Sequence, residues 1–301
     1  MNPPGAGERA RRVAVVFNPA SGRAAPGRRE RAIRAALARA GAEPSWHETT
    51  ATDPGAAAER AVRAGAEVVL VSGGDGTVTA CAAALAGTGV PLAVLPGGTG
   101  NLLALNLGIP TDLERAVEVA LVGARRRIDV GVQGATRFLI MAGLGFDAVV
   151  VAGATRAFKR RFGWLAYLLS ALGALRYPQD WFTLTLDDAA VLRRRASCVL
   201  VANLGRLKAG VQVVRGARPD DGLLDVAVVR AHSLSDWLQV AARVLLGGRW
   251  GDVRVETLRA RKVEVRSTTP HPVEYDGEVA APLDRLVVEV DPASLLVCVP
   301  R

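Results

Sequence analysis

Two patterns of hydrophobic residues divide this chain into two parts. Up to Val122, short runs of consecutive apolar residues alternate with longer segments in which apolar residues recur every three or four positions. Such runs are typical of buried parallel strands, and the longer segments are typical of amphipathic helices. Beyond Arg127, most segments read as strands joined by short turns. The pattern predicts an α/β domain with a parallel sheet, followed by an antiparallel β-rich domain.

The expected elements follow from the same pattern. In the first part the strands are Val13–Phe17, Pro44–Glu48, Val68–Ser72 and Leu92–Leu95, and the helices are Arg28–Ala40, Gly55–Ala64, Val78–Leu85, Asn101–Leu107 and Leu113–Val122. In the second part the strands are Arg127–Val132, Arg137–Ala142, Trp181–Leu186, Ala196–Asn203, Leu224–Val229, Val253–Leu258, Lys262–Arg266 and Leu286–Val290, with helices at Phe162–Leu175 and Ser235–Leu246. We expect a flexible start at residues 1–12, a first domain at 13–127 and a second at 128–301. Whether the last strand of the second domain returns to the first is left open.

One glycine-rich turn stands out at the end of a predicted buried strand. Residues 68–72 are followed by Gly73-Gly74-Asp75-Gly76-Thr77, and then by a helical run. Glycine allows a ligand to approach the backbone closely, and the N–H groups at a helix start suit phosphate. A carboxylate in such a site is explained if a cation or a sugar hydroxyl lies between it and the phosphate. The sequence suggests a nucleotide bound as its magnesium complex, while the alternative is a tight turn with Asp75 as a helix cap.

Two further loops follow predicted parallel strands. Residues 96–101, Pro-Gly-Gly-Thr-Gly-Asn, leave the strand that ends at Leu95, and Asn18-Pro19-Ala20-Ser21-Gly22 leave the strand that ends at Phe17. Adjacent loops at the carboxyl ends of parallel strands form the ligand crevice of an open sheet. No Gly-Lys-Ser/Thr sequence of the Walker type occurs. Backbone N–H groups, Thr77, Thr99 and arginines must therefore bind the phosphates.

The order of these motifs resembles the diacylglycerol kinase catalytic-domain family, which includes bacterial lipid kinases and the sphingosine and ceramide kinases. The resemblance rests on Asn-Pro-x-Ser-Gly, Gly-Gly-Asp-Gly-Thr and Pro-x-Gly-Thr-x-Asn, and it continues to Glu278 through residues 142–148, 220–225 and 275–278. The chain departs from the family pattern at Thr79 and Ala80, where an Asn-Glu pair is usual, and at Leu102, where Asp is common. The resemblance implies an NAD-kinase-like α/β domain, a β-sandwich domain and an active site between them.

The resemblance also implies which residues form the site. The expected ATP-binding residues are Asn18, Pro19, Ala20, Ser21, Gly22, Thr49, Thr50, Gly73, Gly74, Asp75, Gly76, Thr77 and Thr99, with Thr49 or Thr50 near the adenosine and Asp75 holding nucleotide and Mg²⁺.

Carboxylates are the expected catalytic and metal-binding groups. Asp75 is the expected catalytic carboxylate of the first part, and the others lie in the second part. Glu278 is the preferred proton acceptor, and Asp276 supports it or contacts metal. The alternative is a solvated hairpin turn. The family suggests a second Mg²⁺, held by the carboxylate of Asp221 and the backbone carbonyls of Arg218 and Leu223.

The charge of the chain bears on its partners. The formal net charge is +9, and only 5% of the residues are aromatic. Because no nucleic-acid-binding motif is visible, we expect no nucleic acid and favour peripheral contact with an anionic membrane. The cluster Arg156, Lys159, Arg160 and Arg161 precedes an aromatic and aliphatic segment and suits either that contact or a solvated helix cap.

The cysteines and the absence of a signal bear on location. The three cysteines show neither metal spacing nor a disulfide framework, and no signal peptide is evident. We therefore expect a cytoplasmic location. The sequence does not decide whether the protein forms a homodimer.

Together these features predict an ATP-dependent lipid kinase that transfers the γ-phosphate to a lipid hydroxyl, with diacylglycerol or a related lipid as acceptor. The alternatives are an NAD kinase, which shares the Gly-Gly-Asp-Gly motif, and a nucleotide- or membrane-binding regulator without turnover.

Overall fold

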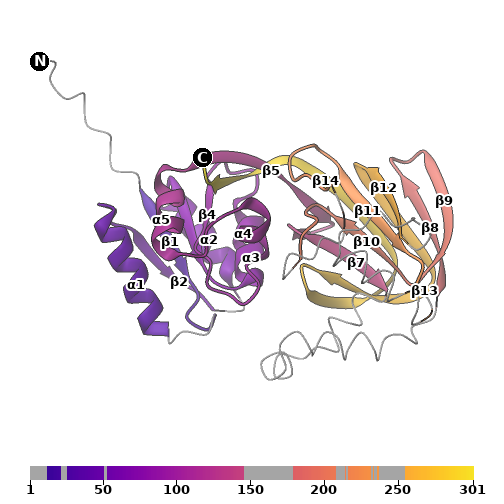
Figure 1. Cartoon of the computed structure of the whole chain (residues 1–301), viewed down its shortest axis with the longest axis horizontal. Helices are drawn as coiled ribbons and strands as arrows, with labels where there is room; N and C mark the ends of the chain where they lie inside the picture. Colours follow the sequence, from indigo (N-terminus) through magenta and orange to yellow (C-terminus); the bar gives the residue numbers. More distant parts are fainter. Residues whose placement is uncertain are drawn as a thin grey trace, which may run out of the picture. The chain divides into compact units, whose positions relative to one another are not determined.

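The chain forms two compact units in a computed structural model (Figure 1). The structure describes residues 12–21, 26–50, 53–145, 179–207, 214, 216–231, 233, 236 and 255–301. The first unit comprises Met1–Arg127 with Leu295–Arg301, and the second comprises Ile128–Ser294. Strands β5 (Ala124–Gln133) and β14 (Glu278–Val299) each contribute residues to both units.

A parallel sheet forms the centre of the first unit. Its strands β1 (Val13–Phe17), β2 (Ser45–Glu48), β3 (Val68–Ser72) and β4 (Leu92–Val94) are arranged in the order β4-β3-β1-β2. The end of β14 adds to β4 in parallel, with Val297 opposite Leu92. Every residue of β1 and β3 is buried, which explains why these strands are continuous apolar runs rather than alternating ones.

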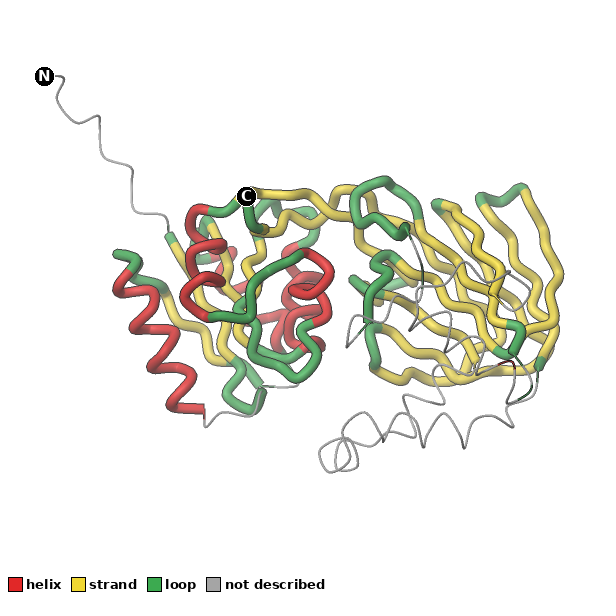
Figure 2. The backbone as a smooth tube through the Cα atoms, viewed as in Figure 1, coloured by secondary structure: helices red, strands yellow, loops and turns green. Residues whose placement is uncertain are grey.

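Five helices occur among the described residues of the same unit: α1 (Pro26–Arg39), α2 (Pro54–Arg63), α3 (Asp75–Leu85), α4 (Leu102–Leu107) and α5 (Leu113–Val122). Figure 2 shows these helices in red beside the strands of the same unit. The apolar faces of α1 and α5 bury Ile33, Leu37 and Val117 against the strands. Helix α3 starts at Asp75, three residues before the expected Val78, because the chain leaves the extended Gly74 directly into helical geometry.

Antiparallel strands form the second unit. The hydrogen-bonded order is β12-β11-β10-β7-β13-β14, while β8 and β9 extend from β13 and β6 pairs with β5. The bounds are β6 (Thr136–Phe138), β7 (Met141–Gly145), β8 (Asp180–Leu186), β9 (Ala190–Ala196), β10 (Cys198–Ala202), β11 (Leu224–Val229), β12 (Val255–Ala260) and β13 (Lys262–Tyr275). Their inward side chains form one apolar core that includes Phe138, Leu144, Phe182 and Val226. The predicted fold class, an α/β domain followed by an antiparallel β-sandwich domain, is confirmed.

Several boundaries differ from the sequence prediction. The expected strand Arg137–Ala142 is divided between β6 and β7, because the N–H groups of Leu139, Ile140 and Met141 donate to the carboxylate of Asp276. The expected strand Lys262–Arg266 extends to Tyr275 as part of β13. The helices expected at Phe162–Leu175 and, apart from Asp236, at Ser235–Leu246 lie outside the described residues.

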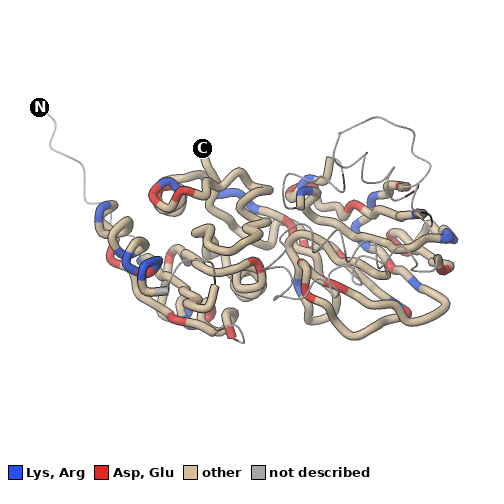
Figure 3. Tube along the Cα trace, turned by 60° about the horizontal axis from the view of Figure 1, so that its bottom comes forward, with Lys and Arg blue, Asp and Glu red and all other residues tan. Residues whose placement is uncertain are grey.

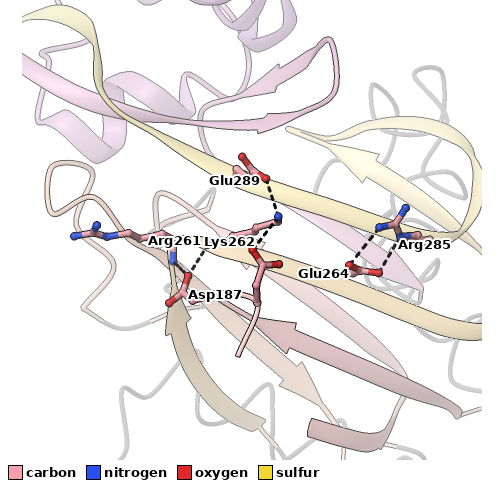
Figure 4. A network of polar contacts seen from close by, with 7 residues as sticks. Asp187, Arg261, Lys262, Glu264, Arg285 and Glu289 are labelled. Atoms are coloured by element: carbon pink, nitrogen blue, oxygen red, sulfur yellow. Dashed lines mark hydrogen bonds and ion pairs between the residues drawn. The ribbon is translucent and has the colours of Figure 1, made fainter. Parts of the chain in front are cut away.

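Ion pairs connect the long strands of the second unit on their surface (Figure 4). Glu264 on β13 accepts a hydrogen bond of 2.8 Å from Arg285 on β14 and is also paired with Arg266. Lys262 lies 3.1 Å from Asp188 and 3.5 Å from Glu289. These pairs secure the register of the hairpin, although each exposed pair contributes only about 0–1 kcal/mol.

All three cysteines, Cys81, Cys198 and Cys298, are buried free thiols. Burial raises the pKa of the Cys81 thiol to about 12, so it stays protonated and unreactive. Among the described residues, no helix has the length and apolar character needed to cross a bilayer.

Candidate active site

The loops after β1 and β3 are joined directly at Asn18. Its backbone N–H donates to the carbonyl of Ser72 (3.0 Å), and its side-chain amide donates to the hydroxyl of Thr77 (2.9 Å). The Asn18 side-chain oxygen accepts from the N–H of Ala20 at 3.0 Å, which closes the turn at Pro19. Asn18 is 4% exposed and Thr77 6% exposed, so this contact is a buried link between the first two predicted phosphate loops.

The loops after β3 and β4 touch through their glycines. A Cβ atom added to Gly98 would lie 2.9 Å from the Cα of Gly74, and one added to Gly73 would lie 2.5 Å from the Thr77 side chain. A larger residue at Gly98 would therefore push the two loops apart, and one at Gly73 would displace Thr77 of its own loop. The hydroxyl of Ser21 lies beside Gly74, at 3.8 Å from where its Cβ would be. The three loops thus meet as the sequence led us to expect.

Asp75 is bonded to the start of a different helix from its own. Its Oδ1 accepts the N–H of Leu102, the first residue of α4, at 2.7 Å. Nearby, the side-chain oxygen of Asn101 accepts from the N–H groups of Gly97 (3.1 Å) and Gly98 (2.9 Å), and Asn101 itself adopts a left-handed φ of 52°. Asp75 therefore positions α4 and the glycine loop before it through one oxygen, and its second oxygen takes no hydrogen bond from the described residues.

A pocket of about 350 Å³ opens at the ends of β1 and β2 in the first unit. Thr49 is fixed in its wall, because its hydroxyl donates to the carbonyl of Asp53 at 2.9 Å. The lining residues are Asn18, Pro19, Ala20, Glu48, Thr49, Thr50, Asp53 and Arg60, five of which the sequence assigned to nucleotide binding. Of the other assigned residues, Thr99 is exposed on the loop after β4, and Gly22 lies outside the described residues.

The turn that carries the predicted catalytic carboxylates joins β13 to β14. Asp276 (φ 49°) and Gly277 (φ 87°) are both left-handed, as a two-residue hairpin turn requires. The Asp276 carboxylate accepts N–H groups from Leu139 (2.8 Å), Ile140 (2.8 Å) and Met141 (3.0 Å), so Asp276 attaches the turn to β7.

Two glutamates complete this turn. Glu274 is 2% exposed, and its Oε2 accepts the N–H of Gly277 at 2.6 Å. Glu278 follows as the exposed first residue of β14. The turn is therefore fixed from two sides, and it presents Glu278 rather than Asp276 to the surroundings.

The predicted second magnesium site contains an arginine of β12. Asp221 accepts from the N–H of Leu223 through Oδ1 (3.2 Å), and its Oδ2 is paired with Arg259, which also lies 3.1 Å from Asp225. A carboxylate with backbone carbonyls, such as those of Arg218 and Leu223, is an oxygen set of the kind that magnesium prefers. A magnesium ion at Asp221 would have to displace this guanidinium. No group of three or more potential metal ligands occurs among the side chains that the structure describes.

Two residues near these sites were not identified from the sequence. Asp129 on β5 is 1% exposed and accepts N–H groups from Gly222 (2.8 Å) and Ala293 (2.7 Å), so it secures the Asp221–Gly222 turn. In the sequence, Asp129 is a charged residue between the apolar residues Ile128 and Val130, and this pattern could have identified it. Arg29, whose guanidinium donates to Ser72 and Leu95, is one of several arginines on α1, and nothing in the sequence distinguished it.

Two sequence-family matches cover almost the whole chain. Residues 12–133 match the diacylglycerol kinase catalytic domain, and residues 140–299 match the YegS C-terminal NAD kinase beta sandwich-like domain. These matches define a lipid kinase. The chain belongs to the diacylglycerol kinase catalytic-domain family, as the order of its motifs indicated.

Curated relatives agree with this assignment. A diacylglycerol kinase of Mycobacterium tuberculosis is 32% identical over 248 residues, which are 80% of this chain and 79% of the relative. A diacylglycerol kinase of Bacillus subtilis is 26% identical over 89% of this chain and 90% of its own length. An uncharacterized protein of Synechocystis is 30% identical over 71% of this chain, and the match spans about half (51%) of that longer relative.

Solved structures show the same fold. A diacylglycerol kinase from Bacillus anthracis aligns with a TM-score of 0.71 at 22% identity, over 96% of each chain. An NAD kinase from Archaeoglobus fulgidus aligns with a TM-score of 0.52 at 16% identity, over 95% of this chain and 93% of the other. The expected relation to the NAD kinase fold is therefore present but distant.

Proposed function

We propose that this lipid kinase transfers the γ-phosphate of ATP, bound with Mg²⁺, to a primary hydroxyl of a lipid, with diacylglycerol as the first candidate. The observation that carries the proposal is the meeting of the three loops around Asn18, Gly74 and Gly98. Backbone N–H groups in such loops suit phosphates, and the adjoining pocket beside Thr49 is available to the adenosine. The kinase names of the relatives support the reaction class.

Each carboxylate in the proposal has a defined part. Asp75 holds the phosphate loops together through Leu102 and offers its second oxygen toward magnesium. Magnesium bound with the phosphates would neutralise the charge that develops during transfer. Glu278 accepts the proton of the lipid hydroxyl, and Asp276 supports Glu278 by fixing the turn to β7. Because phosphoryl transfer depends mainly on positioning and charge stabilisation, fixed loops matter more than reactive groups.

A transfer assay tests the proposal. Purified protein with labelled ATP and Mg²⁺ is incubated with total lipid extract, with diacylglycerol vesicles and, separately, with NAD. We expect label in lipid and none in NADP. Label in NADP alone would favour the NAD kinase alternative, which is considered because an NAD kinase has a related fold. ATP binding without transfer to any acceptor would favour a regulator without turnover.

We further propose peripheral contact with anionic membranes, based on the net charge of +9 and the basic cluster at Lys159–Arg161, which lies outside the described residues. Changing Lys159, Arg160 and Arg161 to Glu should lower binding to anionic vesicles and lipid phosphorylation together, and high salt should weaken binding by the wild type. A matched control reverses Arg31, Arg34 and Arg39, three exposed arginines of α1, with the same change in charge. Equal loss in both triple variants would make this a general charge effect.

We also propose that the protein is located in the cytoplasm, and we leave its oligomeric state to experiment. The three free thiols suit the reducing cytoplasm. Sedimentation equilibrium decides between a monomer and the homodimer that the sequence left open.

A further inference from the structure

Arg29, on the first turns of α1, bridges the ends of two strands in the parallel sheet. Its Nε–H donates to the hydroxyl of Ser72 at 2.9 Å, and its Nη2–H donates to the carbonyl of Leu95 at 2.9 Å. Ser72 is the last residue before Gly73, and Leu95 lies two residues before Gly97. The guanidinium thus lies where β3 and β4 pass into their glycine loops.

The loop after β4 packs directly on this guanidinium. A Cβ atom added to Gly97 would lie 2.0 Å from the central carbon of the Arg29 guanidinium and 2.1 Å from Nη2. Gly97 has no left-handed φ, so its backbone alone does not call for glycine. A side chain at this position would instead displace the Arg29 guanidinium from its two hydrogen bonds. Two independent features of the chain, a glycine and an arginine on a distant helix, therefore fit together at this point.

The positive charge of Arg29 has no acidic counterpart in the described part of the chain. Other arginines of the same unit have carboxylate partners, as Arg39 has Glu114 at 2.6 Å and Arg34 has Glu30 at 2.9 Å. Among the described residues, no carboxylate lies within ion-pair distance of Arg29. Basic residues gather along α1, and Figure 3 shows them on the helix nearest the start of the chain. Among the contacts between described residues, Arg29 is the arginine of α1 that donates to a hydroxyl at a strand end, that of Ser72.

Burial makes this unpaired charge costly. Partial burial lowers the pKa of the Arg29 guanidinium, which nevertheless stays charged at neutral pH because its ordinary value is above 12. A partly desolvated cation that lacks an anion destabilises the folded chain unless a ligand compensates for it. Nη1 takes part in no hydrogen bond with the described residues. The guanidinium therefore retains N–H donors for such a ligand.

We propose that Arg29 is a phosphate-positioning residue, whose guanidinium fixes both glycine loops and offers its remaining N–H donors to the phosphate chain of the nucleotide. The inference rests on the proposed function, because it assumes that the loops bind a nucleotide. It adds to that function a cation contributed by α1, outside every motif of the family pattern given above. Arginine suits the role, since its planar fork binds phosphate oxygens in pairs.

Comparing ligands with and without phosphates tests the proposal. Binding of ATP, tripolyphosphate and adenosine is measured by titration calorimetry for the wild type, Arg29→Gln and Arg29→Lys. The control is Arg28→Gln, which removes a neighbouring exposed charge from the same helix. We expect Arg29→Gln to weaken ATP and tripolyphosphate by about 10- to 100-fold, as loss of a charge-assisted hydrogen bond predicts, and to leave adenosine unchanged. Arg28→Gln should bind all three as the wild type does.

The outcomes separate this proposal from the function on which it rests. Unchanged ATP affinity in Arg29→Gln, or equal weakening of ATP and adenosine, would make Arg29 a structural bridge only, while the kinase assignment would stand. A wild-type chain that binds none of the three ligands would overturn both. Should Arg29→Gln fail to fold, Arg29→Lys decides the question. It keeps the charge but loses the fork, so ATP should weaken several-fold while adenosine does not.

Discussion

The side-chain amide of Asn18 donates a 2.9 Å hydrogen bond to the hydroxyl of Thr77, although the two residues are 59 positions apart. Asn18 follows β1, and Thr77 lies in the first turn of α3 after β3. Because β1 and β3 are parallel neighbours in register, with Phe17 opposite Ser72, both loops leave the sheet at the same edge. The bond joins two motifs that the sequence could only place at separate strand ends.

Asp75 gives the first prediction. Asp75→Asn should abolish phosphate transfer but keep an acceptor for the N–H of Leu102, so the free energy of unfolding should change little. Asp75→Ala should abolish transfer as well and should also lose about 1 kcal/mol of stability, because α4 then lacks its cap. Kinase rate and chemical denaturation are measured on the same samples. Full activity in folded Asp75→Asn would remove the carboxylate from the mechanism.

Glu278 gives the second prediction. Glu278→Gln keeps the size of the side chain but removes the proton acceptor, so turnover should fall by at least about a hundredfold, with ATP binding retained. The matched variant is Asp276→Asn, which alters a carboxylate that accepts three backbone N–H groups. Asp276→Asn should lower stability as well as activity, since an amide offers one acceptor oxygen instead of two. Nearly unchanged turnover in Glu278→Gln would mean either that Asp276 is the proton acceptor or that the reaction needs no general base.

Arg259 gives the third prediction. Its pKa is raised by the hydrogen bond with Asp221, and burial raises the pKa of Asp225 beside it. Arg259→Gln leaves both carboxylates without their cation and should lower the free energy of unfolding by about 1–3 kcal/mol. If the oxygens at Asp221 form the second magnesium site, millimolar Mg²⁺ should raise the melting temperature of Arg259→Gln, and chelator should reverse the rise.

Two controls accompany the metal experiment. Arg194→Gln removes an arginine paired with Glu256 at 2.8 Å, so it measures the loss of an ion pair away from Asp221. The double variant Arg259→Gln with Asp221→Asn should show no response to Mg²⁺. If Mg²⁺ does not change the melting temperature of Arg259→Gln, the metal site at Asp221 is contradicted.

The fourth prediction concerns how the free energy of unfolding changes at acidic pH. Hydrogen bonds from Arg285 and Arg266 lower the pKa of Glu264 to about 2. Figure 4 shows the contact between Glu264 and Arg285. A carboxylate whose pKa is lowered by folding stabilises the folded state above its ordinary value of about 4.5, and this contribution is lost as the pH falls toward 2. The difference in stability between wild type and Glu264→Gln should therefore be constant near neutral pH and shrink between about pH 4.5 and 2.

Urea denaturation across that pH range measures the effect. Glu289→Gln, which changes an exposed carboxylate of the adjacent strand β14, controls for the loss of one negative charge. A difference between wild type and Glu264→Gln that does not depend on pH would show that the ion pairs with Arg266 and Arg285 contribute nothing in solution.

The sequence by itself determined the class of fold and the family. Buried parallel strands are runs of apolar residues, and β1 and β3 were found at the residues expected, because a strand covered on both faces leaves no room for polar positions. The glycine motifs were equally readable, since Gly73 and Gly98 are required by contacts that any side chain would break. Asn101–Leu107 and Leu113–Val122 were placed to within one residue, as α4 and α5.

Only the tertiary structure decided which polar groups act together. Asp276 was assigned to catalysis from its motif, yet its carboxylate holds three N–H groups of residues more than 130 positions earlier in the chain. Arg29 is indistinguishable in sequence from its neighbours on α1, and packing alone brings it onto Gly97. Hydrophobic periodicity is a local property and is written in the sequence. Hydrogen bonds between distant strands depend on which loops the folded sheet brings to one edge, and no local pattern records that.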